Sequence, residues 1–254
     1  MTRVIAVTNQ KGGVGKTTTA VNLAACLAEA GLEVLLIDMD PQANASAGLG
    51  VRPEDARLTS YGVLGGAAGV AEATVRTAVE HLSILPSCPD LAGAVVELAH
   101  ADGNERVLEY ALAGHVRRYD FVFIDCPPSL GILTIDSLVA AREVLIPVQA
   151  EYYALEGLAQ LLDTVRLVRE NLNPQLGILG VLVTMYDGRT RLGREVAAEV
   201  REHLGAHVFA TVVPRNVRLS EAPSHGQPIS RYDATCAGSD AYFDLAKEVV
   251  SREQ

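Results

Sequence analysis

The chain has 254 residues and 49% of them are hydrophobic, which excludes a disordered chain and fits one large α/β domain with a buried core. Its formal net charge of −10 argues against nucleic-acid binding through a uniformly basic surface. No apolar run is long enough to span a bilayer, and no signal peptide precedes the first predicted strand, so we expect a cytoplasmic protein.

The first forty residues predict a strand–helix–strand unit. Residues 4–7 form a short apolar run, a helical pattern continues from about Lys16 to residue 28, and Gly31 is placed to end that helix. A second apolar run, residues 33–38, ends in an acidic residue, as a buried parallel strand does. This order implies a right-handed crossover and a parallel sheet.

Strands and helices continue to alternate through the rest of the chain. Residues 41–80 are rich in Gly, Ala and Ser, and predict a loop with short helices. Further strands are predicted over residues 83–85, 119–125, 143–148, 177–184 and 208–213, and helices within 91–117 and over 130–141, 155–171, 189–204 and 240–250. With no repeat and no linker, this pattern predicts a single domain over 1–254: a doubly wound α/β fold with a mostly parallel sheet and helices on both faces.

The four cysteines are widely scattered and include no C-x-x-C pair. We expect buried, reduced thiols, as in a cytoplasmic protein. They are Cys26, Cys88, Cys126 and Cys236.

Residues 9–19, read as NQKGGVGKTTT, lie between the first strand and the first helix. Glycines allow backbone N–H groups to turn around an anion, and a helix N-terminus adds further donors. This context predicts a phosphate-binding loop in which Lys16 reaches the β- and γ-phosphates and the Thr17 hydroxyl lies on Mg²⁺. The predicted nucleotide-binding residues are Lys11, Gly12, Gly13, Val14, Gly15, Lys16, Thr17 and Thr18.

The loop departs from the usual G-x-x-x-x-G-K-[ST] pattern at its first position. Gln10 occupies the place of the first glycine, and Lys11 adds a second lysine at the front of the loop. Apart from these two, the only lysine in the chain is Lys247, so arginine supplies nearly all other positive charge. A compact ammonium group fits between phosphates better than a guanidinium does, which indicates that both loop lysines serve the nucleotide.

Three aspartates follow predicted strands and would meet at the carboxyl edge of the sheet. Asp125 closes an apolar strand and is the candidate Walker B acid, which reaches Mg²⁺ through water. Asp38 and Asp40 follow the second strand, and either could orient the attacking water or hold the outer shell of the metal. We also expect one of the two to cap the next helix, because Asp40–Pro41 has the form of a helix start.

Positive charge is concentrated late in the chain. Residues 186–232 contain seven arginines against five acidic residues, a surplus of about two in an otherwise acidic protein. An ordinary solvated helix face explains this modest surplus as well as a DNA-binding patch does. Dimerisation would double the patch, because phosphate contacts from two subunits add.

The combined motifs resemble those of the ParA/MinD group of P-loop ATPases, which have a deviant Walker A motif, and the later segments resemble the chromosomal ParA/Soj branch. The similar segments are residues 11–17 (KGGVGKT), 38–42 (DMDPQ), 123–128 (FIDCPP), 147–157 (PVQAEYYALEG), 184–190 (TMYDGRT) and 213–224 (VPRNVRLSEAPS). The resemblance therefore covers essentially the whole chain. One departure is Ala43, where the family usually has glycine.

The resemblance implies an ATP-dependent switch with ATP and Mg²⁺ as cofactors. ATP would join two subunits into a sandwich dimer in which Lys11 crosses to the partner's phosphates. Lys11, Lys16 and Asp40 would be catalytic, with Asp40 orienting the attacking water. Thr17, Asp38 and Asp125 would serve the metal, and Pro214, Arg215 and Asn216 would hold the adenine.

The resemblance also implies non-specific binding of double-stranded DNA by the dimer, and thus association with the nucleoid. A ParB-type centromere-binding partner would stimulate a weak intrinsic ATPase, in the service of chromosome or plasmid partitioning. Arg189 and Arg218 match family positions used for DNA. Arg215, Arg231 and Lys247 are further candidates.

Rival interpretations remain within the same superfamily. A MinD-like membrane-surface ATPase for division-site placement would need a basic amphipathic C-terminal helix, whereas residues 240–254 are net acidic, so no membrane partner is expected. An iron–sulfur reductase would need cysteines at the dimer face, and only Cys126 has a suitable position. A metabolic enzyme that couples ATP to a small substrate would need a further catalytic group, and the sequence offers no such constellation.

Overall fold

The computed structural model describes residues 2–52, 54, 56–98, 103–151 and 154–252. Residues 99–102, inside the predicted helical stretch 91–117, lie outside this range. So do Tyr152 and Tyr153 of the family-like segment 147–157, and residues 253–254 at the chain end.

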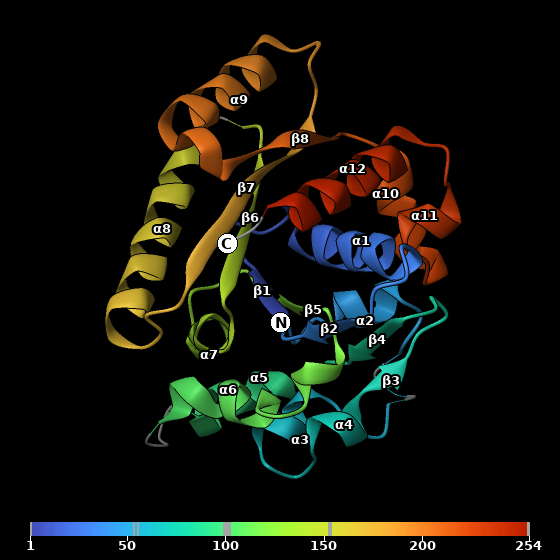
Figure 1. Ribbon diagram of the computed structural model, residues 1–254, viewed down its shortest axis with the longest axis vertical. Helices are drawn as coiled ribbons and strands as arrows, with labels where there is room; N and C mark the ends of the chain where they lie inside the picture. The colour runs from blue at the N-terminus through green and yellow to red at the C-terminus, as the bar shows by residue number, and fades with distance from the viewer. Residues whose placement is uncertain (1, 53, 55, 99–102, 152–153, 253–254) are drawn as a thin grey trace.

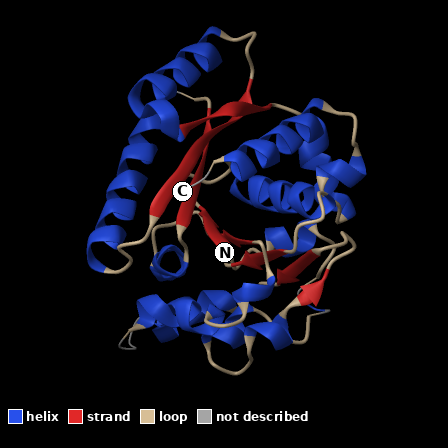
Figure 2. Cartoon of the chain, in the orientation of Figure 1, coloured by secondary structure: helices blue, strands red, loops and turns tan. Residues whose placement is uncertain are grey.

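One twisted sheet organises the described residues (Figures 1 and 2). Its strand order is β3-β4-β2-β5-β1-β6-β7-β8, and every neighbouring pair is parallel except β3 with β4. The strands are β1 Arg3–Val7, β2 Val34–Asp38, β3 Val75–Arg76, β4 Leu82–Leu85, β5 Phe121–Asp125, β6 Glu143–Gln149, β7 Gly177–Tyr186 and β8 Val208–Pro214.

Helices cover both faces of this sheet, which confirms the predicted α/β architecture (Figure 1). One face is covered by α1 Lys16–Glu29, α2 Asn44–Gly48, α10 Val217–Glu221, α11 Ile229–Tyr232 and α12 Ala237–Ser251. The other is covered by α3 Ser60–Leu64, α4 Val70–Ala73, α5 Leu91–Leu98, α6 Val107–Leu112, α7 Ile132–Ala140, α8 Ala154–Asn171 and α9 Arg191–Leu204. Short 3₁₀ turns are η2 Asn104–Arg106, η3 Val116–Arg118, η4 Gly205–His207 and η5 Ala222–His225.

The two cores follow from the alternation of side chains along each strand. In β1, Ile5 and Val7 pack beneath α1 and α12, whereas Val4 and Ala6 pack beneath the opposite helices. Because both faces of the strand are buried, every position must be apolar, and the strands therefore read as continuous hydrophobic runs.

The structure differs from the predicted elements mainly at their ends. Helix α9 begins at Arg191 because the Thr190 hydroxyl accepts the Gly193 N–H at 3.1 Å, so Arg189 lies in a loop. Helix α12 begins three residues before the predicted start at Asp240. The short elements β3, α10 and α11 were not predicted, because two to five residues show no clear period.

The expectation of four buried cysteines is wrong for two of them. All four thiols are free, and Cys26 and Cys126 are buried, whereas Cys88 and Cys236 are partly exposed. These two lie in connecting segments outside the helices and strands, where less chain covers a side chain.

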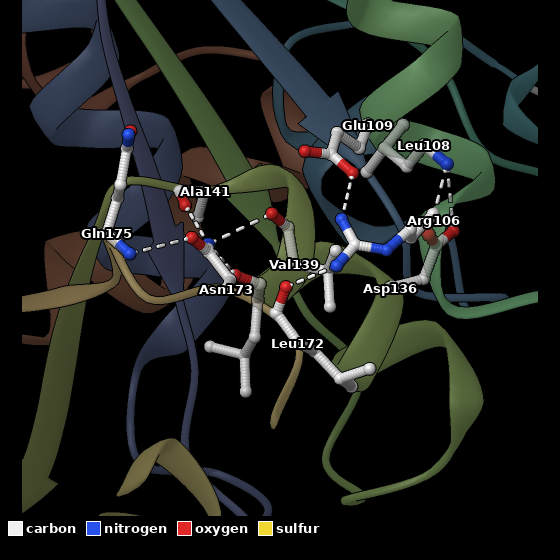
Figure 3. Close-up of polar contacts among 10 residues, drawn as sticks. Arg106, Leu108, Glu109, Asp136, Val139, Ala141, Leu172, Asn173 and Gln175 are labelled. Carbon is white, nitrogen blue, oxygen red and sulfur yellow. Dashed lines mark hydrogen bonds and ion pairs between the residues drawn. The ribbon is translucent and has the colours of Figure 1, made fainter. Parts of the chain in front are cut away.

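Helix α7 follows the Asp125 segment and is fixed by contacts at several points (Figure 3). The carboxylate of Asp136, buried in α7, accepts the Leu108 N–H at the start of α6 at 3.0 and 3.2 Å. At the other end, the Asn173 amide donates to three carbonyls, those of Leu138, Val139 and Ala141. Helix α7, which follows the candidate Walker B strand β5, is therefore held by the start of α6 and by the segment at Asn173.

The C-terminal helix α12 is clamped to the edge of the sheet. The Glu248 carboxylate accepts the N–H groups of Ala210 and Thr211 in β8, at 2.8 and 3.0 Å. Arg252 donates to the Leu179 carbonyl at 2.8 Å and lies over the Phe209 ring at 4.0 Å. Among the described residues, no helix has the length and apolar character needed to cross a membrane.

Candidate nucleotide site

The carboxyl ends of three neighbouring strands place the predicted site residues together. In the parallel register, Asp125 of β5 stands beside Val7 of β1 on one side and Asp38 of β2 on the other. The glycine-rich loop starts directly after Val7. Loop, Asp38 and Asp125 therefore meet at one edge of the sheet, as predicted for ligand binding in a doubly wound fold.

The loop has the backbone that its glycines permit. Gly13 and Gly15 adopt left-handed φ values of 74° and 87°, and α1 begins directly afterwards without a side-chain cap. Asn9 anchors the front of the loop by donating to the Pro147 carbonyl at 2.7 Å. Thr184 of β7 anchors the back by donating to the Val14 carbonyl at 2.8 Å.

Lys16 lies inside the site and is 6% exposed. Its ammonium donates to the Lys11 carbonyl at 3.0 Å. Burial lowers the pKa of Lys16, while the nearby carboxylates, Asp125 first, act in the opposite direction. A buried ammonium with one backbone acceptor is suited to receive a phosphate.

Asp125 is fully buried, and neither of its carboxylate oxygens has a hydrogen-bond partner among the described residues. Burial and the charge of Asp38 raise its pKa well above the usual range, whereas Thr17 and Lys16 act in the opposite direction. A buried carboxylate without partners is costly unless a cation or a bound water compensates it. The residues present therefore fit a divalent cation beside Thr17.

Asp38 and Asp40 make different contacts. The Asp38 carboxylate accepts the Asp40 N–H and both the N–H and the hydroxyl of Ser46, at distances from 2.7 to 3.1 Å. These bonds fix the first turn of α2. Asp40 uses one carboxylate oxygen to accept the Gln42 N–H at 2.9 Å, and its other carboxylate oxygen makes no hydrogen bond with the residues that the structure describes.

The expected helix start at Asp40–Pro41 is wrong. Helix α2 begins at Asn44, and the preceding residue, Ala43, adopts a left-handed φ of 53°. A Cβ is disfavoured in this conformation, so Ala43 takes a backbone geometry that glycine adopts more easily. Asp38, at the end of β2, caps α2 instead, because its carboxylate accepts the Ser46 N–H in the first turn of that helix.

A cavity of about 410 Å³ opens beside the loop, and the three residues that the resemblance assigns to the adenine, Pro214, Arg215 and Asn216, line it. Gly15 and Thr18 of the glycine-rich segment also line this cavity. Sequence reasoning missed Tyr242 of α12, which also lines this cavity and whose hydroxyl lies 3.2 Å from that of Thr19. No local pattern could have revealed a contact across more than 220 residues.

Lys11 faces away from the loop interior. Its ammonium pairs with Glu151 at 2.8 Å, and both side chains are substantially exposed. Gln149 donates to the other oxygen of Glu151 at 2.6 Å. The two loop lysines therefore have different surroundings: Lys16 is buried within the loop, and Lys11 is held at the surface by Glu151.

The structure separates the five candidate DNA-binding residues into two sets. Arg189, Arg215 and Arg218 follow the carboxyl ends of β7 and β8, and the Arg215 N–H donates to the Tyr186 carbonyl at 3.1 Å. Arg231 instead donates to the Ala78 carbonyl, just before the amino end of β4. Lys247 lies in the half of α12 that approaches the amino ends of β7 and β8.

Comparison with known proteins places this site in a family. A family profile described as an AAA domain matches residues 2–178. The sporulation initiation inhibitor protein Soj of Bacillus subtilis is 54% identical over 251 residues, covering 99% of both chains. The chromosome partitioning protein ParA of Caulobacter vibrioides is 51% identical and covers 99% of this chain and 95% of that protein.

The chain belongs to the ParA/Soj family of chromosome-partitioning ATPases. Solved structures agree with the fold of this ParA/Soj-family chain. Cobyrinic acid a,c-diamide synthase from Mycobacterium smegmatis, with a bound ATP analogue and magnesium, has a TM-score of 0.85 and 40% identity, covering 97% of this chain and 93% of that chain. The septum site-determining protein MinD of Pyrococcus horikoshii, with Mg-ADP, has a TM-score of 0.81 and 29% identity, covering 99% and 97%.

Proposed function

We propose that this chain is an ATP-driven switch for chromosome or plasmid partitioning. Mg-ATP closes two subunits into a sandwich dimer, the dimer binds DNA without sequence preference, and slow hydrolysis resets it. The observation that carries the proposal is the separation of Lys16, buried at the phosphate position, from Lys11, held at the surface by Glu151. A lysine presented outward from a phosphate loop is available to a second subunit.

In the proposed function, the glycine-rich loop and the cavity beside it bind the nucleotide. The N–H groups after Gly13 and Gly15 surround the phosphates, and Lys16 exchanges the Lys11 carbonyl for phosphate oxygens. The adenine enters the cavity between the Pro214–Asn216 segment and Tyr242. Thr184 of β7 fixes the conformation of the loop by donating a hydrogen bond to the Val14 carbonyl.

Thr17 and Asp125 are the residues that would hold Mg²⁺, Asp125 through water. When bound, Mg²⁺ neutralises charge that develops on the phosphates. Asp38 supports the site by accepting hydrogen bonds from the N–H and the hydroxyl of Ser46 in α2. Because these bonds occupy its carboxylate, Asp38 plays only a secondary part in holding the metal. Asp40, 6% exposed and with one oxygen outside the Gln42 turn, orients the attacking water.

Dimer closure requires Lys11 to leave Glu151. The exposed ion pair is weak, on the order of 1 kcal/mol or less, so phosphate from a partner can replace it. Lys11 then neutralises charge only when a second subunit is present. This makes the dimer dependent on ATP and hydrolysis dependent on the dimer.

DNA binding falls to Arg189, Arg215 and Arg218 of both subunits, the set beyond the carboxyl ends of β7 and β8. Non-specific contacts to phosphates depend on the number of cations presented together, so pairing two weak patches strengthens binding. A ParB-type centromere-binding protein stimulates hydrolysis and releases the DNA. The switch therefore associates with the nucleoid in its ATP form.

The alternative of a MinD-like membrane-surface ATPase requires a C-terminal helix that is available to lipid. In this chain, Tyr242, Leu245 and Val249 of α12 are buried, and Glu248 binds β8. These contacts favour DNA over membrane as the partner. Robust co-sedimentation with liposomes in the presence of ATP would overturn this choice.

The deciding experiment measures binding to a random-sequence DNA duplex with ATP, with ADP and without nucleotide, across a salt series. We expect binding only with ATP and its loss at moderate salt. Size-exclusion chromatography under the same conditions reports the dimer. Equal binding in all three nucleotide states would contradict the proposed switch.

A further inference from the structure

The loop between β7 and α9 contains an exposed, bidentate ion pair. The Arg189 guanidinium donates through Nε to Asp187 Oδ1 at 2.9 Å and through Nη2 to Oδ2 at 2.8 Å. The Arg189 side chain is otherwise 90% exposed. Two parallel bonds from a guanidinium fork to a carboxylate have the same geometry that arginine uses to bind a phosphate.

The backbone of this loop is fixed against α9. The Thr190 hydroxyl donates to the Asp187 carbonyl at 2.9 Å, and Arg194 donates to the Gly188 carbonyl at 2.7 Å. A Cβ on Gly193 would lie 2.8 Å from the Asp187 carbonyl oxygen, which shows how closely the loop and helix pack. Asp187 therefore stays in place, while the exposed Arg189 side chain can rotate away from it.

Asp187 also faces a second candidate DNA-binding residue. The hydrogen bond between the Arg215 N–H and the Tyr186 carbonyl brings Arg215 next to Asp187. The pKa of Asp187 is lowered to about 2, first by hydrogen bonds from Arg189 and further by the charge of Arg215. One carboxylate thus opposes the positive charge of two arginines in the proposed DNA surface.

We propose that Asp187 is a built-in competitor for DNA, whose carboxylate occupies Arg189 in the place of a backbone phosphate. The inference rests on the proposed DNA-binding function and adds a regulatory residue to it. Binding of DNA exchanges one anion for another at Arg189, so a single subunit gains little from the contact. Only a dimer that presents several cations to adjacent phosphates overcomes the competition, which suppresses DNA binding outside the ATP form.

The opposite role for the contact between Asp187 and Arg189 predicts the opposite change in DNA affinity. If Asp187 instead holds Arg189 ready for DNA, removing its charge will weaken DNA binding. Asp187→Asn separates the two roles, because an asparagine keeps an oxygen that can accept the Arg189 N–H, a bond now 3.0 Å long. The bond to the Arg189 backbone N–H is retained, whereas the charge and the second acceptor oxygen of the ion pair are lost.

The test compares DNA affinity of wild type and Asp187→Asn with ATP, by fluorescence anisotropy on a random-sequence duplex. We expect binding about three- to tenfold tighter in the variant, since one competing anion is removed. The matched control is Asp163→Asn, which removes one charge from an exposed pair with Arg166 on α8 and should leave the affinity unchanged. Asp187→Ser gives a second neutral variant with a side-chain oxygen.

A double-mutant cycle decides whether the gain passes through Arg189. In an Arg189→Ala background, Asp187→Asn should produce less than half of its gain. Weaker or unchanged binding by both Asp187 variants, or an equal gain in the control, would overturn the inference while wild-type DNA binding with ATP stands. Absence of ATP-dependent DNA binding in the wild type would overturn the proposed function and this inference with it.

Discussion

Lys16 and Lys11 stand five residues apart in one loop, yet their ammonium groups have different surroundings. Lys16 is buried and bonded to a backbone carbonyl, whereas Lys11 is bonded to an exposed carboxylate. A buried ammonium with an incomplete set of acceptors gains most from a phosphate, because its burial has already removed it from water. The nucleotide contacts of the monomer should therefore depend on Lys16 far more than on Lys11.

We predict that Lys16→Ala weakens ATP binding by about 100-fold or more, the loss expected for about 3 kcal/mol of charge-assisted hydrogen bonds. Titration with a fluorescent ATP analogue measures it. Lys247→Ala is the control, because that exposed lysine pairs with Asp244 on α12, away from the cavity. Retained affinity in Lys16→Ala would remove the phosphate-loop assignment.

Loss of the Asp40 carboxylate should slow ATP hydrolysis, because this group is the candidate that orients the attacking water. Asp40→Ala should lower ATP turnover by about 100-fold, the lower range for loss of a general acid–base group, and should accumulate an ATP-bound, DNA-binding form. Asp40→Asn is the matched variant, because it keeps the oxygen that accepts the Gln42 N–H. If turnover is unchanged in both variants, the role of orienting water passes to Asp38.

Those residues of the candidate site that belong to short local motifs can be proposed from the sequence alone. The loop from Lys11 to Thr18 and the acid Asp125 could be read from a strand, a turn and a helix in the right order. The sequence did not predict Glu151, Tyr242 or Asp187 as partners. Glu151 and Tyr242 contact residues that lie far away in the sequence, and no pattern of spacing records such contacts. Asp187 contacts Arg189 two residues further on, but an acidic residue next to an arginine in a loop is too common a pattern to single out.

At the scale of elements, α7 connects the Asp125 segment to its neighbours through Asp136 (Figure 3). Burial raises the pKa of Asp136 to about 7, against an ordinary value of 3.8, although the Leu108 N–H favours the charged form. The unfolded chain releases this proton near pH 4, and the folded chain holds it until near pH 7. The contribution of Asp136 to stability therefore falls as the pH rises through this interval and is constant above it.

Asp136→Asn should abolish this pH dependence. Relative to wild type, the variant is expected to gain on the order of 3 kcal/mol in free energy of unfolding between pH 4.5 and pH 8, because each pKa unit corresponds to about 1.4 kcal/mol. Asparagine keeps an acceptor for the Leu108 N–H. Urea unfolding at the two pH values measures the change, and parallel pH profiles for the two proteins would contradict it.

Long periodic elements were predicted well, and short ones were not. The central strands and α1, α8 and α9 were found because a buried strand or an amphipathic helix repeats its signal over several residues. The strand β3 has two residues, and α10 and α11 have five and four, so their form depends on what they pack against. The segment Pro214–Tyr232 takes its shape from α1, since Asn22 of α1 accepts the Ile229 N–H at 2.6 Å.

At the scale of the whole molecule, a net charge of −10 is combined with a small cationic set beyond β7 and β8. An acidic body repels DNA at long range, so only phosphates that touch the arginines contribute favourably. In the proposed dimer, Arg189, Arg215 and Arg218 would provide three phosphate contacts per subunit. Six phosphate contacts correspond to a slope of about −5 in a plot of log K against log salt concentration.

The slope of log K against log salt concentration can be compared between variants without reference to their absolute DNA affinities. Arg189→Ala removes one contact from each subunit and should reduce the magnitude of the slope by about two units, since each phosphate contributes about 0.9. Lys247→Ala, at the opposite end of α12 from the set, should leave the slope unchanged. ATP-driven dimerisation, followed by light scattering, should stay as in wild type for both variants. An unchanged slope in Arg189→Ala would show that the loop between β7 and α9 does not touch DNA. The DNA-binding surface would then have to consist of other arginine or lysine side chains.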